Sequence, residues 1–324
     1  MADPDAPAWR SARRAVLDHL LGLLAEPAWS HGLVLRGSMC MVAWAPRGCR
    51  EPADLDWMVP PLPGGGGTPY PFTDSLESVQ QWPEAFDGAA RYEPWREEEF
   101  GTAGTRPLLP PEGLNWAPAP EEPFDPGAEL AAAIRRSPRA APGIVLDPDR
   151  IRVDGQWTYQ QYETPGIRLL VPWHADGRPP GEIGIDFARD ERLPQAPVLT
   201  AVPRADGGRP TVLRTASREL SLAWKLLWLH SDWTTGGRSR GKDLYDAVLL
   251  AESPRTLLPD RLLRSVLRHA LGADAGGWEP SAVRRWDVEW DTFRARYPRV
   301  RGTAEDWTGR LERALGPAPG RPSP

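Results

Sequence analysis

The spacing of apolar residues changes near residue 214, and this change constrains the fold more than any other feature. Before it, short apolar runs bounded by turn residues predict strands at residues 32–35, 55–59, 150–153, 166–172 and 182–187. After it, apolar residues recur at helical spacing: Leu220, Ala223, Trp224, Leu227, Trp228, Leu244, Val248, Leu249, Leu262, Leu263, Val266 and Leu267. Residues 8–28 and 39–45 predict two further helices. We therefore expect an α/β (α+β) fold, in which a small mixed sheet is followed by helices.

A long segment between the predicted strands lacks a regular pattern. Residues 60–143 hold sixteen of the 38 prolines and a run of four glycines, with only short helical patterns at residues 75–81 and 129–136, which indicates an irregular insertion. We expect the first part of the core at residues 1–59 and its second part at residues 144–213. A helical domain is expected at residues 214–315, and the proline-rich tail at 316–324 is expected to be disordered.

Composition excludes several classes of protein. The net charge of −5 provides no general basic field for nucleic acid, so any RNA contact must be local. No apolar run reaches the length of a membrane span, and the N-terminus lacks a signal-like apolar core, so we expect a cytoplasmic protein without a membrane partner. Cys40, Cys49 and the five histidines show no metal-ligand spacing. The sixteen tryptophans are expected mainly to fill the core.

Two aspartates on one predicted strand are the first candidate site residues. Alternation along the strand at residues 55–59 places Asp54 and Asp56 on one face and apolar side chains on the other. Carboxylates this close repel each other, and a divalent cation bound by oxygen removes that penalty. Upstream, Gly37 permits a close approach of the backbone to a ligand, and Ser38 can donate a hydrogen bond to phosphate. The pattern predicts a metal site beside a phosphate site.

A third carboxylate is expected on a neighbouring strand. In the run at residues 182–187, Asp186 faces away from the apolar side chains of Ile183, Ile185 and Phe187. Glu182 lies on the same face as Asp186 and is its competitor. A purely structural role for Asp186 at the end of the strand is the alternative.

The predicted helical domain contains a second group of charged residues. Lys225 interrupts an apolar helix face, where a lysine stem usually packs on the core with its amine in water. About twenty residues later, Asp243 and Asp246 share one helix face at a spacing of three residues. The same region contains a basic run of Arg238, Arg240 and Lys242, which is suited to a triphosphate or an RNA backbone. A solvated loop is the alternative.

These motifs resemble those of two related protein families. A strand, Gly-Ser, a short helix and a strand with Asp-x-Asp resemble the active site of polymerase-β-like nucleotidyltransferases. Lys225 followed by Lys-Asp-Leu-Tyr-Asp at residues 242–246 resembles AbiEii/AbiGii-type nucleotidyltransferases, the toxins of type IV toxin–antitoxin systems. The sequence departs from the first pattern at residues 46–50, where a loop lengthens the spacer before the acidic strand.

The resemblance implies an enzyme that transfers NMP from an NTP to a hydroxyl and expels pyrophosphate. It implies Mg²⁺ or Mn²⁺ as cofactor, held by Asp54, Asp56 and Asp186, in a cleft between the core and the helical domain. It further implies that Lys225 meets the phosphates and that Asp243 orients the site. The remaining nucleotide-binding residues are expected to be Gly37, Ser38, Arg240 and Lys242.

Partners follow from the same resemblance. The acceptor is expected to be the 3′ end of a transfer RNA or another RNA, and a cognate antitoxin regulator is an expected partner. The rival hypothesis is a binding or regulatory protein on a catalytically degenerate nucleotidyltransferase fold, with the segment at residues 60–143 as its partner surface.

Overall fold

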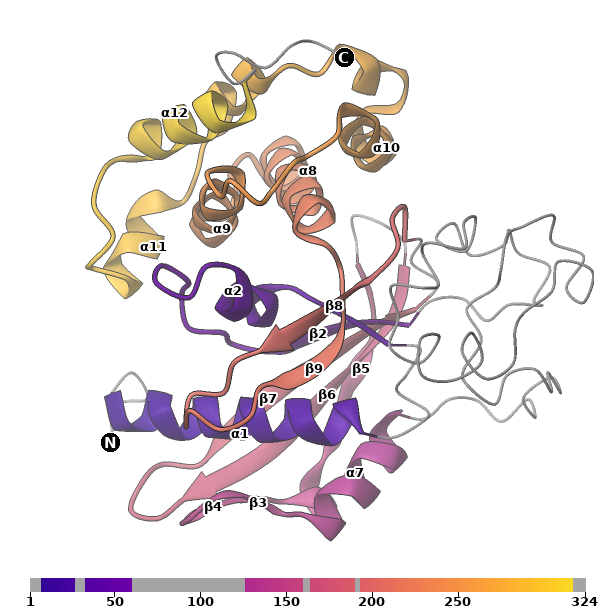
Figure 1. Ribbon diagram of the computed structural model, residues 1–324, viewed down its shortest axis with the longest axis vertical. Coiled ribbons are helices and arrows are strands. Elements are labelled where there is room, and N and C mark those ends of the chain that lie inside the picture. Colours follow the sequence, from indigo (N-terminus) through magenta and orange to yellow (C-terminus); the bar gives the residue numbers. More distant parts are fainter. Residues whose placement is uncertain (1–6, 27–32, 60–125, 160–163, 190–192, 317–324) are drawn as a thin grey trace, which may run out of the picture. The chain divides into compact units, whose positions relative to one another are not determined.

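The chain forms two compact units. The computed structural model describes residues 7–26, 33–59, 126–159, 164–189 and 193–316. Residues 1–43 and 51–216 make up a sheet unit, and residues 44–50 together with 217–324 make up a helical unit. A mixed sheet followed by helices confirms the predicted fold class (Figure 1). Most of the predicted insertion and the C-terminal tail lie outside the described residues.

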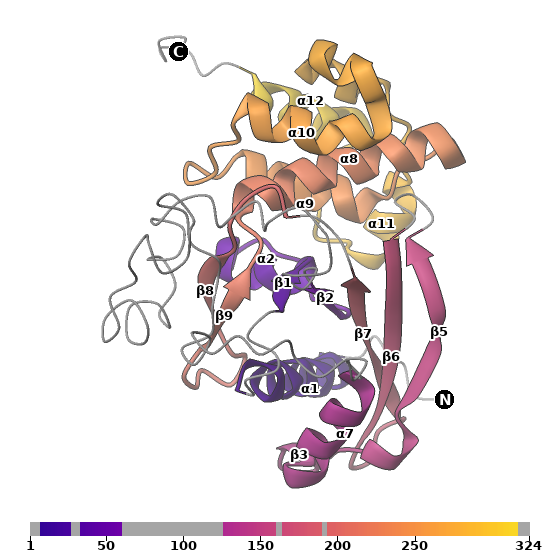
Figure 2. The ribbon, with the colours of Figure 1, turned by 90° about the vertical axis from the view of Figure 1, so that its right-hand side faces the viewer.

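The sheet unit contains nine strands among its described residues. They are ordered β3-β4-β6-β7-β2-β1-β9-β8, and β5 pairs with β6 beside this path. Their bounds are β1 Val34–Arg36, β2 Leu55–Val59, β3 Arg139–Ala141, β4 Ile144–Leu146, β5 Arg152–Tyr159, β6 Thr164–Ala175, β7 Gly181–Arg189, β8 Val198–Val202 and β9 Thr211–Thr215. The pairs β2/β7 and β1/β9 are parallel and the others are antiparallel. Figure 2 shows the long strands β5, β6 and β7 side by side.

Strand β2 sits in the middle of the sheet because one of its faces is strongly apolar. Leu55 and Trp57 are almost fully buried and pair in register with Ile185 and Phe187 of β7, which are also buried. Alternation then turns Asp56 to the opposite face, where β7 presents its own polar side chains. The apolar face thus fixes the register that positions the acidic face.

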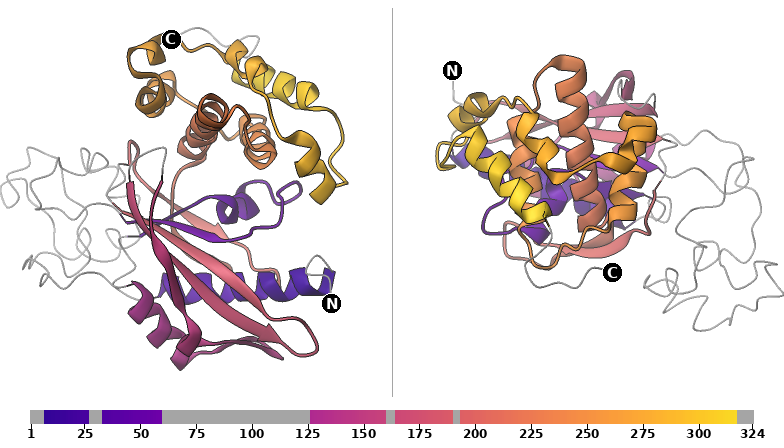
Figure 3. Two further views of the ribbon diagram at one scale, coloured as in Figure 1. Left: turned by 180° about the vertical axis from the view of Figure 1, so that it is seen from behind. Right: turned by 90° about the horizontal axis from the view of Figure 1, so that it is seen from above.

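Helix α1 (Pro7–Ala25) covers one face of the sheet, and α2 (Ser38–Trp44) lies on the other side (Figures 1 and 3). The buried stripe of α1 repeats at helical spacing, as the sequence predicted: Val16, Leu17, Leu20, Leu21 and Leu24. Helix α7 (Pro126–Arg136) packs beside α1. Helix α7 confirms the short helical pattern at residues 129–136, while the edge strand β3 lies within the segment that we expected to be irregular.

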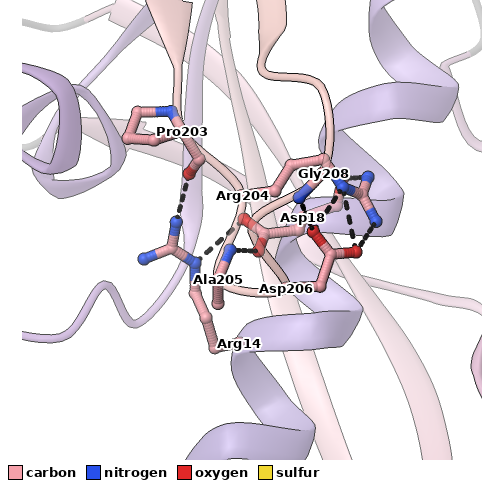
Figure 4. A network of polar contacts seen from close by, with 7 residues as sticks. All are labelled: Arg14, Asp18, Pro203, Arg204, Ala205, Asp206 and Gly208. Atoms are coloured by element: carbon pink, nitrogen blue, oxygen red, sulfur yellow. Dashed lines mark hydrogen bonds and ion pairs between the residues drawn. The ribbon is translucent and has the colours of Figure 1, made fainter.

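A buried ion pair fastens α1 to the turn between β8 and β9 (Figure 4). Within α1, Arg14 donates to Asp18 at 2.9 Å, and both residues are buried. Arg14 also donates to the carbonyl of Pro203 at 2.8 Å, and the Ala205 amide donates to Asp18 at 2.8 Å. Each charge is thus paired and hydrogen-bonded, the condition under which burial is tolerated. The hairpin β8–β9, which the apolar pattern did not predict, is held through this network.

The helical unit is built around two helices in contact, α8 (Arg218–Gly236) and α9 (Gly241–Ala251). The Ser217 hydroxyl accepts from the Leu220 amide at the start of α8, and Gly237 ends the helix in a left-handed conformation. Helix α10 (Asp260–Leu271) packs on α8, while α11 (Trp290–Arg296) and α12 (Ala304–Leu315) pack on α9. These helices appear in orange to yellow in Figure 3.

Aromatic side chains join the outer helices to α9. The rings of Tyr245, Phe293, Trp290 and Trp307 form successive contacts with centroid separations of 5.0–5.2 Å. Trp290 and Trp307 are buried, as expected for tryptophans that fill a core. None of the helices in the described parts of the chain is both long and apolar enough to cross a membrane.

The α1 network yields a stability prediction. Replacing Asp18 by alanine leaves the buried Arg14 guanidinium without its carboxylate and the Ala205 amide without its acceptor, so we expect a loss of about 3 kcal/mol in unfolding free energy. Chemical denaturation followed by circular dichroism measures this. Asp206→Ala is the matched control, because Asp206 belongs to the same network but is 58% exposed, and its loss should change stability much less. Equal effects of the two substitutions would contradict the role assigned to Asp18.

Candidate active site

A row of four charged residues crosses the middle of the sheet. Arg36 of β1 is in register with Asp56 of β2, Asp56 with Asp186 of β7, and Asp186 with Arg168 of β6. Residues in register on adjacent strands project to the same face, and neighbouring strands are about 4.8 Å apart. The two predicted carboxylates Asp56 and Asp186 are therefore direct neighbours, with an arginine on each side of the pair.

The third acidic residue precedes this row along the chain. Asp54 lies immediately before β2 and is partly buried, as is Asp56. The charges of both aspartates help to raise the pKa of Arg168, so their carboxylates act on the same guanidinium. Asp54, Asp56 and Asp186 are thus concentrated around one end of the β2–β7 pair.

Asp186 is held by a bidentate ion pair. The Arg168 Nε donates to Asp186 Oδ1 at 2.6 Å, and a terminal guanidinium nitrogen donates to Oδ2 at 2.7 Å. Asp186 is 5% exposed. The hydrogen bond to Asp186 is the largest cause that raises the pKa of Arg168; burial opposes it. Glu182, the competitor for the third position, instead pairs with Arg152 near the surface at 3.0 Å.

The Gly37-Ser38 turn lies directly against the acidic row. Gly37 has a φ of 77°, and a Cβ at this position would overlap the Asp56 carboxylate. Ser38, the first residue of α2, is 2% exposed, and its hydroxyl has no hydrogen-bond partner among the described residues. A buried hydroxyl without a partner is costly, so a ligand that accepts a hydrogen bond here would gain affinity.

This donor set matches a hard divalent cation in kind. Three carboxylates are the type of ligand that Mg²⁺ and Mn²⁺ prefer, and the glycine removes the side chain that would block their approach. In the described part of the chain, no three carboxylate, histidine or cysteine side chains converge closely enough to form a ready metal site. Both carboxylate oxygens of Asp186 instead accept hydrogen bonds from Arg168. The residues fit the ion chemically, and Asp186 has a protein cation, Arg168, as its partner in this structure.

The helical unit contains a second, fully buried ionic cluster. Lys225 Nζ lies 2.6 Å from Asp243 Oδ1 and 3.2 Å from Asp246 Oδ2. Arg50 donates to the same Asp246 carboxylate at 3.0–3.2 Å. Two cations and two anions thus share one enclosed region, and the amine of Lys225 is not in water, contrary to the alternative considered for it.

Burial and charge act in opposite directions on these groups. Burial alone lowers the pKa of Lys225, but Asp243 and Asp246 raise it above its ordinary value. Burial likewise raises the pKa of Asp243, while Lys225 and Lys242 bring it below its ordinary value. The raised lysine pKa and the lowered aspartate pKa both favour the charged pair, which therefore stays intact at neutral pH.

Sequence analysis missed Arg50. It belongs to the spacer at residues 46–50 that we took for an added loop, and this segment is part of the helical unit. The Tyr245 hydroxyl also donates to the carbonyl of Gly48 at 2.5 Å, and a Cβ on Gly48 would touch Leu249. The sequence did contain a signal for a second buried cation, because two aspartates on one apolar helix need two cationic partners and Lys225 is only one.

The predicted basic run is partly paired. Arg238 lies 3.2 Å from Asp287, and Arg240 lies 3.7 Å from Asp232. Both arginine side chains remain more than half exposed. Ion pairs this exposed are weak, so the guanidinium groups can still bind an anion. The assignment of Arg240 and Lys242 to nucleotide binding stays a prediction.

Comparison with known proteins decides the family. A family model described as the nucleotidyl transferase AbiEii toxin of type IV toxin–antitoxin systems matches residues 120–321. The chain belongs to the AbiEii family. A solved structure, the nucleotidyltransferase toxin MenT4 from Mycobacterium tuberculosis H37Rv, has a similar fold with a TM-score of 0.51 and 16% identity, covering 96% of this chain and 84% of that chain. No curated protein matches the sequence.

The AbiEii match confirms the predicted family and covers only some of the candidate residues. It includes Asp186, Lys225 and Asp243 and begins after Gly37, Ser38, Asp54 and Asp56. The family match therefore does not cover the N-terminal motif of this AbiEii protein. The pairing of β2 with β7 connects that motif to the matched region.

The first site prediction concerns Gly37. Gly37→Ala must accept an unfavourable left-handed conformation and also displace the Asp56 carboxylate. Gly177→Ala is the matched control, because Gly177 has a φ of 67° and nothing within 4 Å of an added Cβ. The control should lose only about 1–2 kcal/mol from backbone conformation. We expect a larger loss for Gly37→Ala in thermal unfolding, and equal losses would show that Asp56 has room to move.

The second site prediction concerns Arg50. Arg50→Met leaves the fully buried Asp246 with Lys225 alone, and we expect a loss of about 3–5 kcal/mol in unfolding free energy. In the double variant Arg50→Met/Asp246→Leu, the loss should be smaller than the sum of the single losses. The control is Arg135→Met, because its ion pair with Asp149 is exposed and worth only about 0–1 kcal/mol. Additive single losses would show that Arg50 and Asp246 are not coupled.

Proposed function

We propose that this AbiEii nucleotidyltransferase moves an NMP unit from an NTP onto a hydroxyl, using Mg²⁺ or Mn²⁺ bound by Asp54, Asp56 and Asp186. The observation that supports this most is the register of Asp56 with Asp186 beside the Gly37-Ser38 turn. Family membership makes the protein a nucleotidyltransferase toxin. The dependence on an NTP and a metal, and the acceptor, are the proposed part.

The reaction requires one bond to form and one to break. The acceptor oxygen attacks the α-phosphorus, and the bond between that phosphorus and the pyrophosphate oxygen breaks, so pyrophosphate leaves. When bound, the divalent ion would neutralise negative charge on the phosphates and lower the pKa of the attacking hydroxyl. Asp186 would accept the proton of that hydroxyl. Arg168 donates to both oxygens of Asp186 and so fixes the orientation of this carboxylate.

Several hydrogen-bond donors are proposed to bind phosphate. The Ser38 hydroxyl is buried and lacks a partner among the described residues, which suits it to a phosphate oxygen. Lys225 and Asp243 are proposed to act as a pair, in which Asp243 fixes the position of the ammonium group. Arg240 and Lys242 would add cations at the start of α9.

The acceptor and the partner protein follow from the family. A toxin of a toxin–antitoxin system implies an antitoxin, and we propose a cognate regulator as its partner. We propose an RNA acceptor, such as the 3′ end of a transfer RNA, in the cytoplasm. With a net charge of −5, RNA contacts must be local, and the exposed Arg238 and Arg240 offer such a contact.

Pyrophosphate release from each of the four NTPs, with Mg²⁺ or Mn²⁺ and total RNA, tests the proposal. Asp54→Ala and Asp186→Asn should each lower the rate by at least roughly a hundredfold, because charge neutralisation in phosphoryl transfer is lost. Glu182→Gln is the matched control for the third carboxylate. Glu182 lies on the same strand and face but pairs with Arg152 near the surface, so the rate should not change.

Two outcomes would count against this function. Full activity of Asp54→Ala would remove the metal-site assignment. Nucleotide binding that is independent of metal and unaffected by Asp56→Asn, without turnover of any NTP, would instead favour a degenerate fold that binds but does not catalyse. Calorimetry with a nonhydrolysable NTP, with and without Mg²⁺, separates these cases.

A further inference from the structure

Arg168 covers a carboxylate that the proposed function assigns to the metal. The Asp186 side chain is 7% exposed, whereas the Arg168 side chain is 42% exposed. The guanidinium therefore reaches a buried acceptor from a position that solvent can enter. Both carboxylate oxygens accept from it, at 2.6 and 2.7 Å. This fork-to-fork geometry is the strongest form of the arginine–carboxylate pair.

The charge balance of the row together with Asp54 shows what this contact does. The formal charges of the three aspartates and the two arginines sum to −1 for these five residues. Adding a divalent ion would give +1 if both arginines stayed in place. If Arg168 left, the net charge would be −2 and the ion would neutralise it. Removal of the guanidinium therefore favours the cation on electrostatic grounds.

We propose that Arg168 occupies the place of the divalent cation on Asp186, so that the metal binds in competition with the arginine. Arg168 is then a positioning residue, since it holds the Asp186 carboxylate in a fixed orientation until the cation arrives. This inference rests on the proposed function, because it takes Asp186 as a metal ligand. A guanidinium released from Asp186 keeps a planar set of donors that matches a phosphate group.

Mn²⁺ binding to the full-length protein, followed by the electron paramagnetic resonance of free Mn²⁺, tests this directly without any turnover. Arg168→Gln should bind Mn²⁺ more tightly than the unsubstituted protein, by roughly three- to tenfold, because a competing cation is gone. Arg168→Lys should lie between the two, since it keeps the charge but loses the bidentate fork. If Arg168 only stabilised the fold, its removal would weaken Mn²⁺ binding or leave it unchanged.

The sheet offers a matched control. Arg152 pairs with Glu182 at 3.0 Å, and both partners are exposed. Glu182 lies on the same strand as Asp186, four residues before it. Arg152→Gln removes the same charge without uncovering a carboxylate of the acidic row, so Mn²⁺ affinity should stay the same. If Arg152→Gln raised the Mn²⁺ affinity as much as Arg168→Gln, the effect would come from the change in overall charge, and the proposal would be overturned.

The other outcomes are also decisive. Equal or weaker Mn²⁺ binding by Arg168→Gln overturns the proposal, and if that variant does not fold, Arg168→Lys must still bind more tightly than the unsubstituted protein. If Asp56→Asn abolishes Mn²⁺ binding while both Arg168 variants bind like the unsubstituted protein, only the competition is wrong. If no protein binds Mn²⁺ and Asp54→Ala retains pyrophosphate release, the proposed metal site fails as well.

Discussion

The structure of the acidic row depends on the parallel pairing of β2 with β7. This pairing puts Asp56 directly beside Asp186, an arrangement that repulsion between carboxylates disfavours. It persists because the opposite face joins Trp57 to Phe187 in a buried, largely apolar layer, and a slip of one residue would turn the aspartates into that layer. The hydrophobic core thus holds the carboxylates together, and Arg36 and Arg168 offset their charge at the two sides.

The two ionic groups of this protein differ in their exposure and in their charge balance. In the helical unit, Lys225 and Arg50 match Asp243 and Asp246, and the cluster is neutral and fully enclosed. Such a group has little to gain from an added metal cation, because both of its carboxylates already have protein cations as partners. The acidic row and Asp54 together have a formal charge of −1, and Arg168 of the row is partly exposed. The carboxylate row is therefore the group that is electrostatically able to accept a cation.

Local patterns in the sequence were sufficient for the elements that contain the motifs. Strand β2, helix α2 and the helical pattern of α8 and α9 follow from residues near one another in the chain, and the structure confirms them. The contacts of Arg168 and Arg50 could not be predicted in this way. Arg168 meets Asp186 through the register of β6 with β7, and Arg50 meets Asp246 at a separation of 196 residues. Hairpin β8–β9 was missed because its anchor is Asp18 of α1.

The long spacer before the acidic strand has a physical explanation in these contacts. Residues 44–50 leave α2, join the helical unit through Arg50 and Gly48, and return to the sheet at Asp54. A spacer without this loop would lack Arg50, and Asp246 would keep Lys225 as its only cation in the described cluster. An uncompensated buried carboxylate is costly, so this second cation stabilises the cluster. The loop that interrupts the motif in sequence therefore gives Asp246 a partner beside Lys225, which also contacts Asp243 at 2.6 Å.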